Sequence, residues 1–248
     1  MVRASGAVTV GAIEQRFGVS PMTARRDLAE LERQGALRRT HGGAVLSGVS
    51  THEDSFEQRV ETDAPAKRAL ATAAAKLVVP RETIFLDSSS TTYYLARAIV
   101  ESGIEATLLT NSLPIMDLVT TQGSDRIELV GIGGSLRRLT SSFVGPTATQ
   151  SVKSHFADRV FFSVKGITPD GVLTDADLLE AEVKRAMVGQ SAASFLLVDG
   201  SKLSTQGLNA ILPIEQIHNV VVHGVEKSNL GVLDSPKLTV HYAQGGVA

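Results

Sequence analysis

Six short apolar runs that alternate with helical segments restrict the fold of this chain more than any other feature. The runs lie at residues 83–86, 107–109, 127–130, 160–164, 195–198 and 220–222. Helices are predicted at residues 62–77, 92–100, 113–120, 147–155 and 178–190. Strands that are apolar throughout and alternate with helices are typical of a parallel sheet covered on both faces. We therefore predict a Rossmann-like α/β domain over residues 62–248.

Small, polar or cationic residues follow five of these runs, at the sheet edge where parallel α/β folds bind ligands. The predicted ligand-binding residues are Asp87, Ser88, Ser89, Ser90, Thr91, Asn111, Gly133, Gly134, Lys165 and Lys202. The turn at residues 88–92 leads into a helix whose positive end favours a phosphate, although an ordinary Ser/Thr helix cap explains the same pattern. Gly133 and Gly134 also fit a tight turn. Lys165 and Lys202 are stronger evidence for a ligand site. Each follows an apolar strand, where a solvated surface position is less expected for a lysine.

Glu180 is a further candidate, four residues before Lys184 on a predicted helix. This spacing most often marks an ion pair on the protein surface. The functional interpretation places the Glu180 carboxylate in the crevice, where it binds sugar hydroxyls.

A second unit precedes the α/β domain. Ser20 is a typical helix cap and Pro21 suits the first helical position, so a helix is predicted over residues 21–34, with Gly35 as its stop. Helical projection places Ala24, Leu28 and Leu31 on one face and Met22, Arg26, Glu30 and Arg33 on the opposite face. Residues 36–41 form a short alternating run of the kind found in strands, and Gly42 and Gly43 close it. This pattern predicts a two-stranded wing. A solvated arginine-rich helix is the common alternative on charge alone. The ordered succession of a short helix at residues 9–17, a turn, the capped helix and the wing instead favours DNA binding.

The distribution of charge supports this division. The chain carries a formal net charge of −2, but its first 43 residues contain seven Lys and Arg against four Asp and Glu. A basic head on an acidic body confines contact with phosphates to one end. The sequence has no cysteine, which excludes disulfides and thiolate metal sites, and its six histidines have no metal-ligand spacing, so neither a metal site nor a cofactor is predicted. No apolar run approaches the roughly 18 residues of a membrane span, and a cytoplasmic protein is expected.

The head resembles the winged helix-turn-helix of the DeoR family of bacterial transcriptional regulators. The matching residues are Val19, Ser20, Thr23, Arg25 to Leu28, Gly35 and His41 to Ala44. The resemblance implies a DNA-binding set made of Ser20, Met22, Thr23, Arg25, Arg26, Arg38, Arg39 and His41. Within it, Met22, Thr23 and Arg26 are assigned to base edges. Arg25, Arg38 and Arg39 are assigned to contacts with phosphates. His41 is assigned to the contact between the wing and DNA.

The body resembles the sensor domain of the same family. The motifs are Asp-Ser-Ser-Ser-Thr at residues 87–91, Thr-Asn-Ser at 110–112, Gly-Gly at 133–134, Val-Gly-Pro at 144–146, Gly-Val-Leu-Thr at 171–174, Glu180 to Met187 and Asp-Gly-Ser-Lys at 199–202. The resemblance implies a fold similar to ribose-5-phosphate isomerase and glucosamine-6-phosphate deaminase, with a phosphorylated sugar as effector. Ser89 stands where the family often has glycine, which implies a tighter or differently hydrogen-bonded phosphate loop. Lys165-Gly166 stands where many members have a small or acidic residue, which indicates a subgroup with its own effector.

The predicted domains are the DNA-binding head at residues 1–45, a linker at 46–61 and the sensor at 62–248. Members of the family normally carry an earlier helix in the head. Residues 1–8 cannot supply it, so either the start codon is set too far downstream or the head is incomplete.

The expected function is a homo-oligomeric transcriptional regulator, a repressor of carbohydrate genes that a phosphosugar releases from double-stranded DNA. The alternative is a phosphosugar isomerase or deaminase, which needs a general base that Glu180, Asp175 or Asp177 could supply. The basic head has no purpose in such an enzyme. A third alternative is a ligand-binding remnant with an inactive head.

Overall fold

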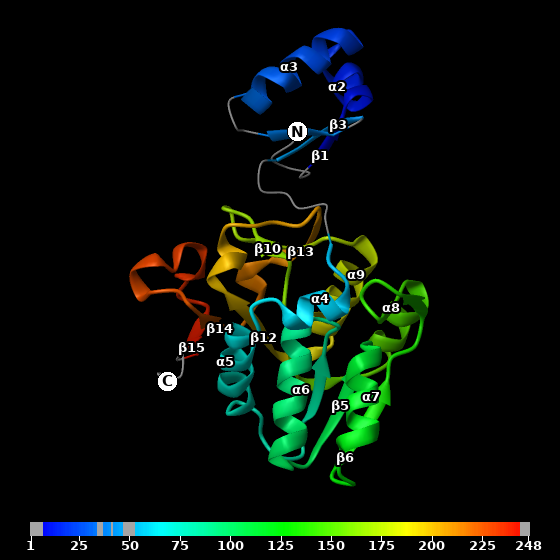
Figure 1. Ribbon diagram of the computed structural model, residues 1–248, viewed down its shortest axis with the longest axis vertical. Coiled ribbons are helices and arrows are strands. Elements are labelled where there is room, and N and C mark those ends of the chain that lie inside the picture. The colour runs from blue at the N-terminus through cyan, green and yellow to red at the C-terminus, as the bar shows by residue number, and fades with distance from the viewer. Residues whose placement is uncertain (1–6, 34–36, 41, 47–52, 244–248) are drawn as a thin grey trace.

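A seven-stranded parallel sheet forms the centre of the body (Figure 1). The computed structural model describes residues 7–33, 37–40, 42–46 and 53–243. The strand order is β15-β14-β12-β9-β4-β5-β6. In chain order the strands are β4 (Thr83–Leu86), β5 (Ala106–Thr110), β6 (Ile127–Gly131), β9 (Ala157–Phe162), β12 (Ser191–Asp199), β14 (Asn219–His223) and β15 (Thr239–Tyr242). The predicted Rossmann-like α/β architecture is confirmed.

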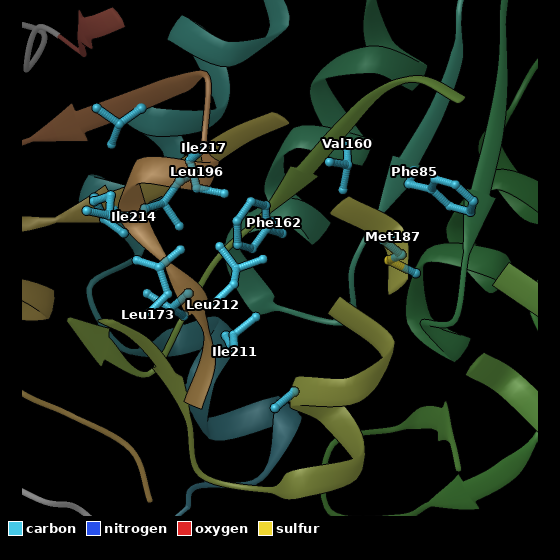
Figure 2. Packing of buried hydrophobic residues seen from close by; sticks show 14 of the residues in the cluster. Phe85, Val160, Phe162, Leu173, Met187, Leu196, Ile211, Leu212, Ile214 and Ile217 are labelled. Carbon is cyan, nitrogen blue, oxygen red and sulfur yellow. The ribbon is translucent and has the colours of Figure 1, made fainter. Parts of the chain in front are cut away.

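Helices cover both faces of this sheet, because successive strand residues point to opposite sides. One layer contains α5 (Ala64–Ala75), α6 (Ser90–Ser102) and α7 (Leu113–Gln122), which pack on a cluster that includes Ile84 and Leu86. The other layer contains α8 (Pro146–Lys153) and α9 (Leu178–Gly189), whose cluster includes Phe85. Figure 2 shows part of this second cluster, which includes Phe85, Val160 and Phe162 of the sheet and Met187 of α9.

Several strands were not predicted, because no local sequence pattern indicates them. A small antiparallel sheet joins β10 (Gly166–Ile167), β11 (Val172–Asp175) and β13 (Asn209–Pro213), and a hairpin joins β7 (Ser135–Arg137) to β8 (Ser142–Val144). The partner of β11 lies about 40 residues further along the chain, with Val172 opposite Pro213, so no alternation within either strand reveals the pairing. The 3-10 turns η1 (Gly200–Leu203), η2 (Ile214–Gln216), η3 (Lys227–Asn229) and η4 (Gly231–Leu233) complete the body.

Part of the predicted linker is helical. Residues Phe56–Glu61 form α4, which begins with a capping box between Ser55 and Gln58. The Phe56 ring meets the Tyr93 ring of α6 edge-on at 5.5 Å, and the Tyr94 hydroxyl donates to the Val60 carbonyl at 3.1 Å. This segment is therefore packed against α6.

The head contains the predicted helices and an additional strand. Its elements are β1 (Ala7–Thr9), α2 (Val10–Phe17), α3 (Pro21–Arg33), β2 (Leu37–Thr40) and β3 (Gly43–Leu46). The wing was predicted to have two strands, but β1 pairs with β3 and makes three. Ala24 and Leu28 are buried as predicted, whereas Leu31 is 39% exposed because it lies in the last turn of α3. The predicted stop at Gly35 lies outside the described residues.

None of the helices in the described ranges is long and apolar enough to cross a membrane.

Candidate functional site

A cavity of about 120 Å³ opens at the carboxyl ends of β4 and β9. From β4 the chain proceeds to β5 and β6 on one side, while β9 is followed by β12 and β14 on the other. Ligands of parallel sheets bind at such a reversal, because the connections leave the sheet in opposite directions. The volume far exceeds that of a single buried water. The lining residues are Glu53, Asp54, Arg59, Thr62, Asp63, Lys67, Ser89, Ser90, Thr91, Ser163, Val164, Lys165, Asp175, Ala176, Lys184, Asp199 and Lys202.

The N-terminus of α6 forms one wall of this cavity. Ser89 caps the helix, since its Oγ accepts from the Thr92 N–H at 3.2 Å. Ser90 and Thr91 lie in the first turn, whose N–H groups have no carbonyl partner within a helix. Together with the helix dipole, these groups favour an anion at this wall. Of the predicted ligand-binding residues, the structure brings together Ser89, Ser90, Thr91, Lys165 and Lys202.

A buried cluster of charges forms the floor. Lys184 Nζ lies 2.7 Å from an Asp175 carboxylate oxygen and 3.1 Å from an Asp87 carboxylate oxygen, and donates to the Ser163 carbonyl at 2.8 Å. Burial alone would lower the pKa of Lys184, but Asp175 and Asp87 together raise it well above its ordinary value. The cluster ties the ends of β4, β9 and β11 to α9, so it shapes the cavity.

Asp87 itself does not line the cavity, contrary to our prediction. Its Oδ1 accepts from the Ser89 N–H at 3.1 Å and from the Ser89 hydroxyl at 2.6 Å, and its Oδ2 accepts from the Ser163 N–H at 3.2 Å. These contacts fix the start of α6 against the end of β9. Asp87 is therefore a positioning residue beneath the site.

The prediction for Glu180 also needs correction. The residue is 3% exposed and does not line the cavity. Its carboxylate accepts from the Ser88 hydroxyl at 2.8 Å and from the Ser142 hydroxyl at 2.5 Å. Burial raises the pKa of Glu180, with Lys184 acting in the opposite direction. The alternative of a surface ion pair is wrong as well, since both Glu180 and Lys184 are buried. Ser88, the donor to Glu180, is likewise outside the lining.

Asn111, Gly133 and Gly134 lie away from the cavity because they follow β5 and β6, on the far side of the reversal from β9. The Asn111 amide donates to the Phe143 carbonyl at 2.9 Å. A Cβ at Gly134 would lie 2.8 Å from the Cβ of Ala148, so glycine there permits the close approach of α8. Gly134 therefore has a packing role, and the Asn111 amide connects the end of β5 to β8.

Two cations of the cavity, Arg59 and Lys67, were missed by the sequence analysis. Lys67 donates to the carbonyls of Arg59 and Thr62, and the residue is buried. Burial, assisted by the charge of Lys202, lowers the pKa of Lys67 to about 8. The capping box at Ser55 was the available signal, because it predicts an ordered helix that carries Arg59 within the supposed linker.

The exposed face of α3 forms the candidate DNA interface. Met22 is 79% exposed, and Arg25 and Arg26 are exposed beside it. Ser20 caps the helix by accepting from the Thr23 N–H at 3.2 Å. These residues present a single apolar side chain and two cations on one helix, which suits insertion into a major groove.

In the wing, Arg39 is already bound to a carboxylate of α3, so it is less available to DNA than predicted. The Nε of Arg39 donates to Glu32 at 2.7 Å, and the Arg39 backbone N–H donates to the same carboxylate at 2.8 Å. These hydrogen bonds lower the pKa of Glu32. Arg39 must therefore exchange a carboxylate for a phosphate in order to contact DNA. His41 and the side chain of Arg38 lie outside the described residues.

The three acids that were considered as a general base already have partners. Asp177 caps α9 and lies 3.3 Å from Arg137, Asp175 is paired with Lys184, and Glu180 accepts two hydroxyls away from the cavity. Among the described residues, no group of three or more His, Cys, Asp or Glu side chains could hold a metal ion.

Comparison with known proteins identifies relatives of both units. Residues 62–223 match the family described as the DeoR C terminal sensor domain, and residues 1–48 match the DeoR-like helix-turn-helix domain. The lactose phosphotransferase system repressor of Streptococcus mutans is 31% identical over 88% of this chain and 86% of its own length. The L-fucose operon activator of Escherichia coli K12 is 32% identical over 86% of this chain and 87% of its own. The putative aga operon transcriptional repressor of Escherichia coli O157:H7 is 31% identical over 89% and 82% of the two chains.

Among solved structures, ribose 5-phosphate isomerase A from Methanocaldococcus jannaschii is similar with a TM-score of 0.42. It shares 18% identity over 57% of this chain and 55% of its own. This similarity is too low for an inference about the present chain.

Proposed function

The chain belongs to the DeoR family of transcriptional regulators, and we propose that it binds operator DNA through α3 and the wing and releases it when a phosphosugar occupies the cavity. The observation that carries the effector assignment is the meeting of the α6 N-terminus with Lys165 and Lys202 in one cavity. A helix N-terminus and lysines bind a phosphate, and the carboxylates of the same lining suit sugar hydroxyls.

The relatives support carbohydrate genes as the regulated class, because their names refer to the lactose phosphotransferase system, the L-fucose operon and the aga operon. Two of these three are named repressors and one an activator. Release of DNA by the effector corresponds to repression in the ligand-free state, which is the direction we propose. We further propose a cytoplasmic homo-oligomer, since operators with two-fold symmetry match a two-fold protein.

We propose that the DNA-binding residues divide into those that contact bases and those that contact phosphates. Met22, Thr23 and Arg26 read base edges from the exposed face of α3, while Arg25, Arg38 and Arg39 contact phosphates and His41 contacts DNA from the wing. Positioning on the backbone and reading of bases are separable, because phosphate contacts carry no direct sequence information.

An enzyme is the alternative that the cavity alone would allow. Isomerisation through an enediol needs a general base beside the substrate carbon. Asp175 is the single member of the three candidate bases that lines the cavity, and its ion pair with Lys184 opposes uptake of a proton. This pairing favours a binding site without turnover.

The proposed function is tested by fluorescence anisotropy of the chain on DNA from its own upstream region, with and without phosphosugars. Ribose 5-phosphate, glucose 6-phosphate, fructose 1-phosphate and glucosamine 6-phosphate are suitable probes. Specific binding that one probe reverses is the expected result. Turnover of any probe without specific DNA binding would instead favour the enzyme.

The low pKa of Lys67 predicts that phosphosugar affinity falls as the pH rises. The folded, ligand-free protein loses the Lys67 proton near pH 8. A bound phosphate dianion stabilises the ammonium and raises that pKa, so binding takes up a proton above pH 8. Affinity is expected to be about tenfold lower at pH 9 than at pH 7, a range in which the phosphate is already a dianion.

Isothermal titration of the phosphosugar from pH 7 to pH 9 measures this effect. The groups that face Lys67 are Lys202, Asp63, Asp199 and Arg59. The Lys67→Arg variant keeps its charge throughout and should give a flat profile. An equal affinity of the unmodified protein at pH 7 and pH 9 would exclude Lys67 from the site.

A further inference from the structure

The segment that joins the head to the sensor is itself part of the cavity wall. We define the connector as residues 53–61, which end with α4. Glu53, Asp54 and Arg59 of the connector line the cavity together with the start of α6. A ligand bound there therefore touches the chain that leads directly to the DNA-binding head.

Side-chain and backbone contacts dock the connector on the sensor. The Glu53 carboxylate accepts from both terminal nitrogens of Arg137 on β7, at 2.6 and 3.0 Å. The Phe56 N–H donates to the Leu139 carbonyl in the β7–β8 hairpin at 2.9 Å. These polar contacts hold the connector together with the packing of the buried Phe56 ring on Tyr93. Among them, the ion pair of Glu53 with Arg137 is the contact that a change of charge in the cavity can disturb.

Among the described residues that line the cavity, Arg59 is the one with buried side-chain nitrogens that lack a hydrogen-bond partner. Its Nε and Nη2 atoms are buried and have no hydrogen-bond partner among the described residues. Its guanidinium carbon lies 5.9 Å from the centre of the Phe56 ring. A buried guanidinium donor without an acceptor is costly, and carboxylate or phosphate oxygens are its best partners.

Lys67 holds Arg59 in position. It donates to the Arg59 and Thr62 carbonyls, which fixes the turn between α4 and α5. The backbone of Arg59 is thereby anchored while its side chain lies at the cavity. Lys165 and Lys202 enter the same cavity from the ends of other strands.

From these observations we infer that Arg59 binds the anionic group of the effector and transmits its binding to the connector. A bound anion attracts Arg59 and repels Glu53 and Asp54 of the same segment. Occupied and unoccupied sensors therefore favour different positions of the connector, which is the differential contact that effector control of DNA binding requires. This inference rests on the proposed function and adds the residue that couples the two sites.

The test replaces Arg59 by glutamine, which keeps hydrogen-bond donors but removes the charge. Arg59→Gln should weaken binding of inorganic phosphate and of the releasing phosphosugar at least tenfold, since hydrogen bonds to charged groups are the strong ones. Release of operator DNA should need at least tenfold more phosphosugar. Arg59→Lys restores the charge and should recover part of the affinity.

Arg68→Gln is the matched control. Arg68 is exposed on α5, beside the Tyr94 ring, and does not line the cavity. The melting temperature without ligand separates a binding role from a structural one. Arg59→Gln should melt no lower than the Arg68→Gln protein, because the substitution removes two buried guanidinium nitrogens that lack an acceptor among the described residues. A lower melting temperature together with an unchanged midpoint for release would overturn the inference.

The outcomes for the two proposals are distinct. Failure of every phosphosugar to release the unmodified chain contradicts the proposed function. Release of the unmodified chain and of Arg59→Gln at the same concentrations contradicts the role of Arg59 alone. If the unmodified chain binds neither inorganic phosphate nor any phosphosugar, both are contradicted.

Discussion

Replacing Lys184 by methionine is expected to lower the free energy of unfolding by about 3–5 kcal/mol, the range for breaking a buried ion pair by removing one partner. The substitution leaves the carboxylates of Asp87 and Asp175 buried without their cation. It also removes the donor to the Ser163 carbonyl. Methionine matches the length of the lysine stem, so lost packing contributes little to the expected change.

Urea unfolding followed by circular dichroism measures the loss. Lys153→Met provides the control, because Lys153 is an exposed residue in the last turn of α8. A change within about 0.5 kcal/mol is expected there. A loss below about 1 kcal/mol for Lys184→Met would mean that the two carboxylates find other partners, and the cluster would not be the element that shapes the cavity floor.

Replacing Arg25 and Arg26 together by alanine is expected to weaken operator binding by about two orders of magnitude or more. Each arginine is exposed on α3, and loss of a base or phosphate contact typically costs about 1–3 kcal/mol. Alanine has the higher helix propensity, so α3 should persist. The effect therefore reports binding and not folding.

The single variants separate the proposed phosphate contact of Arg25 from the proposed base contact of Arg26. Arg25→Ala should weaken binding to all DNA sequences and reduce the salt slope by about one unit, as expected for a phosphate contact. Arg26→Ala should relax discrimination at one base position. Arg97→Ala, an exposed arginine on α6, serves as the control. Binding of the double variant at the affinity of the unmodified protein would remove α3 from the interface.

The sequence predicted the elements whose signals are local. The strand at residues 83–86 is continuously apolar and appears as β4, and the helix that begins at Pro21 appears as α3 with Ser20 as its cap. Lys165 and Lys202 were correctly placed at the cavity, because the carboxyl ends of parallel strands share one edge of the sheet. That rule does not say which strands flank the reversal of the sheet connections. For this reason Asn111, Gly133 and Gly134 were predicted at a cavity that they do not line.

Contacts between distant segments could not be predicted from local spacing. The spacing between Glu180 and Lys184 defines a helix face but does not show what covers it, and here α9 turns that face to the buried hydroxyls of Ser88 and Ser142. Arg59 lies in a stretch that follows polar and Gly/Ser-rich residues, so it was assigned to the linker. Only the packing of α4 on α6 brings it to the cavity.

The most direct test of effector control is the affinity of the releasing phosphosugar for the free protein and for the protein saturated with operator DNA. Coupling between two sites is reciprocal, so the phosphosugar should bind the operator complex more weakly by the same factor by which it weakens DNA binding, in the range of about 5–150-fold. Isothermal titration in both states measures the two constants. Equal affinities in the presence and absence of operator would contradict the account, because a ligand that binds both states equally cannot shift the protein between them.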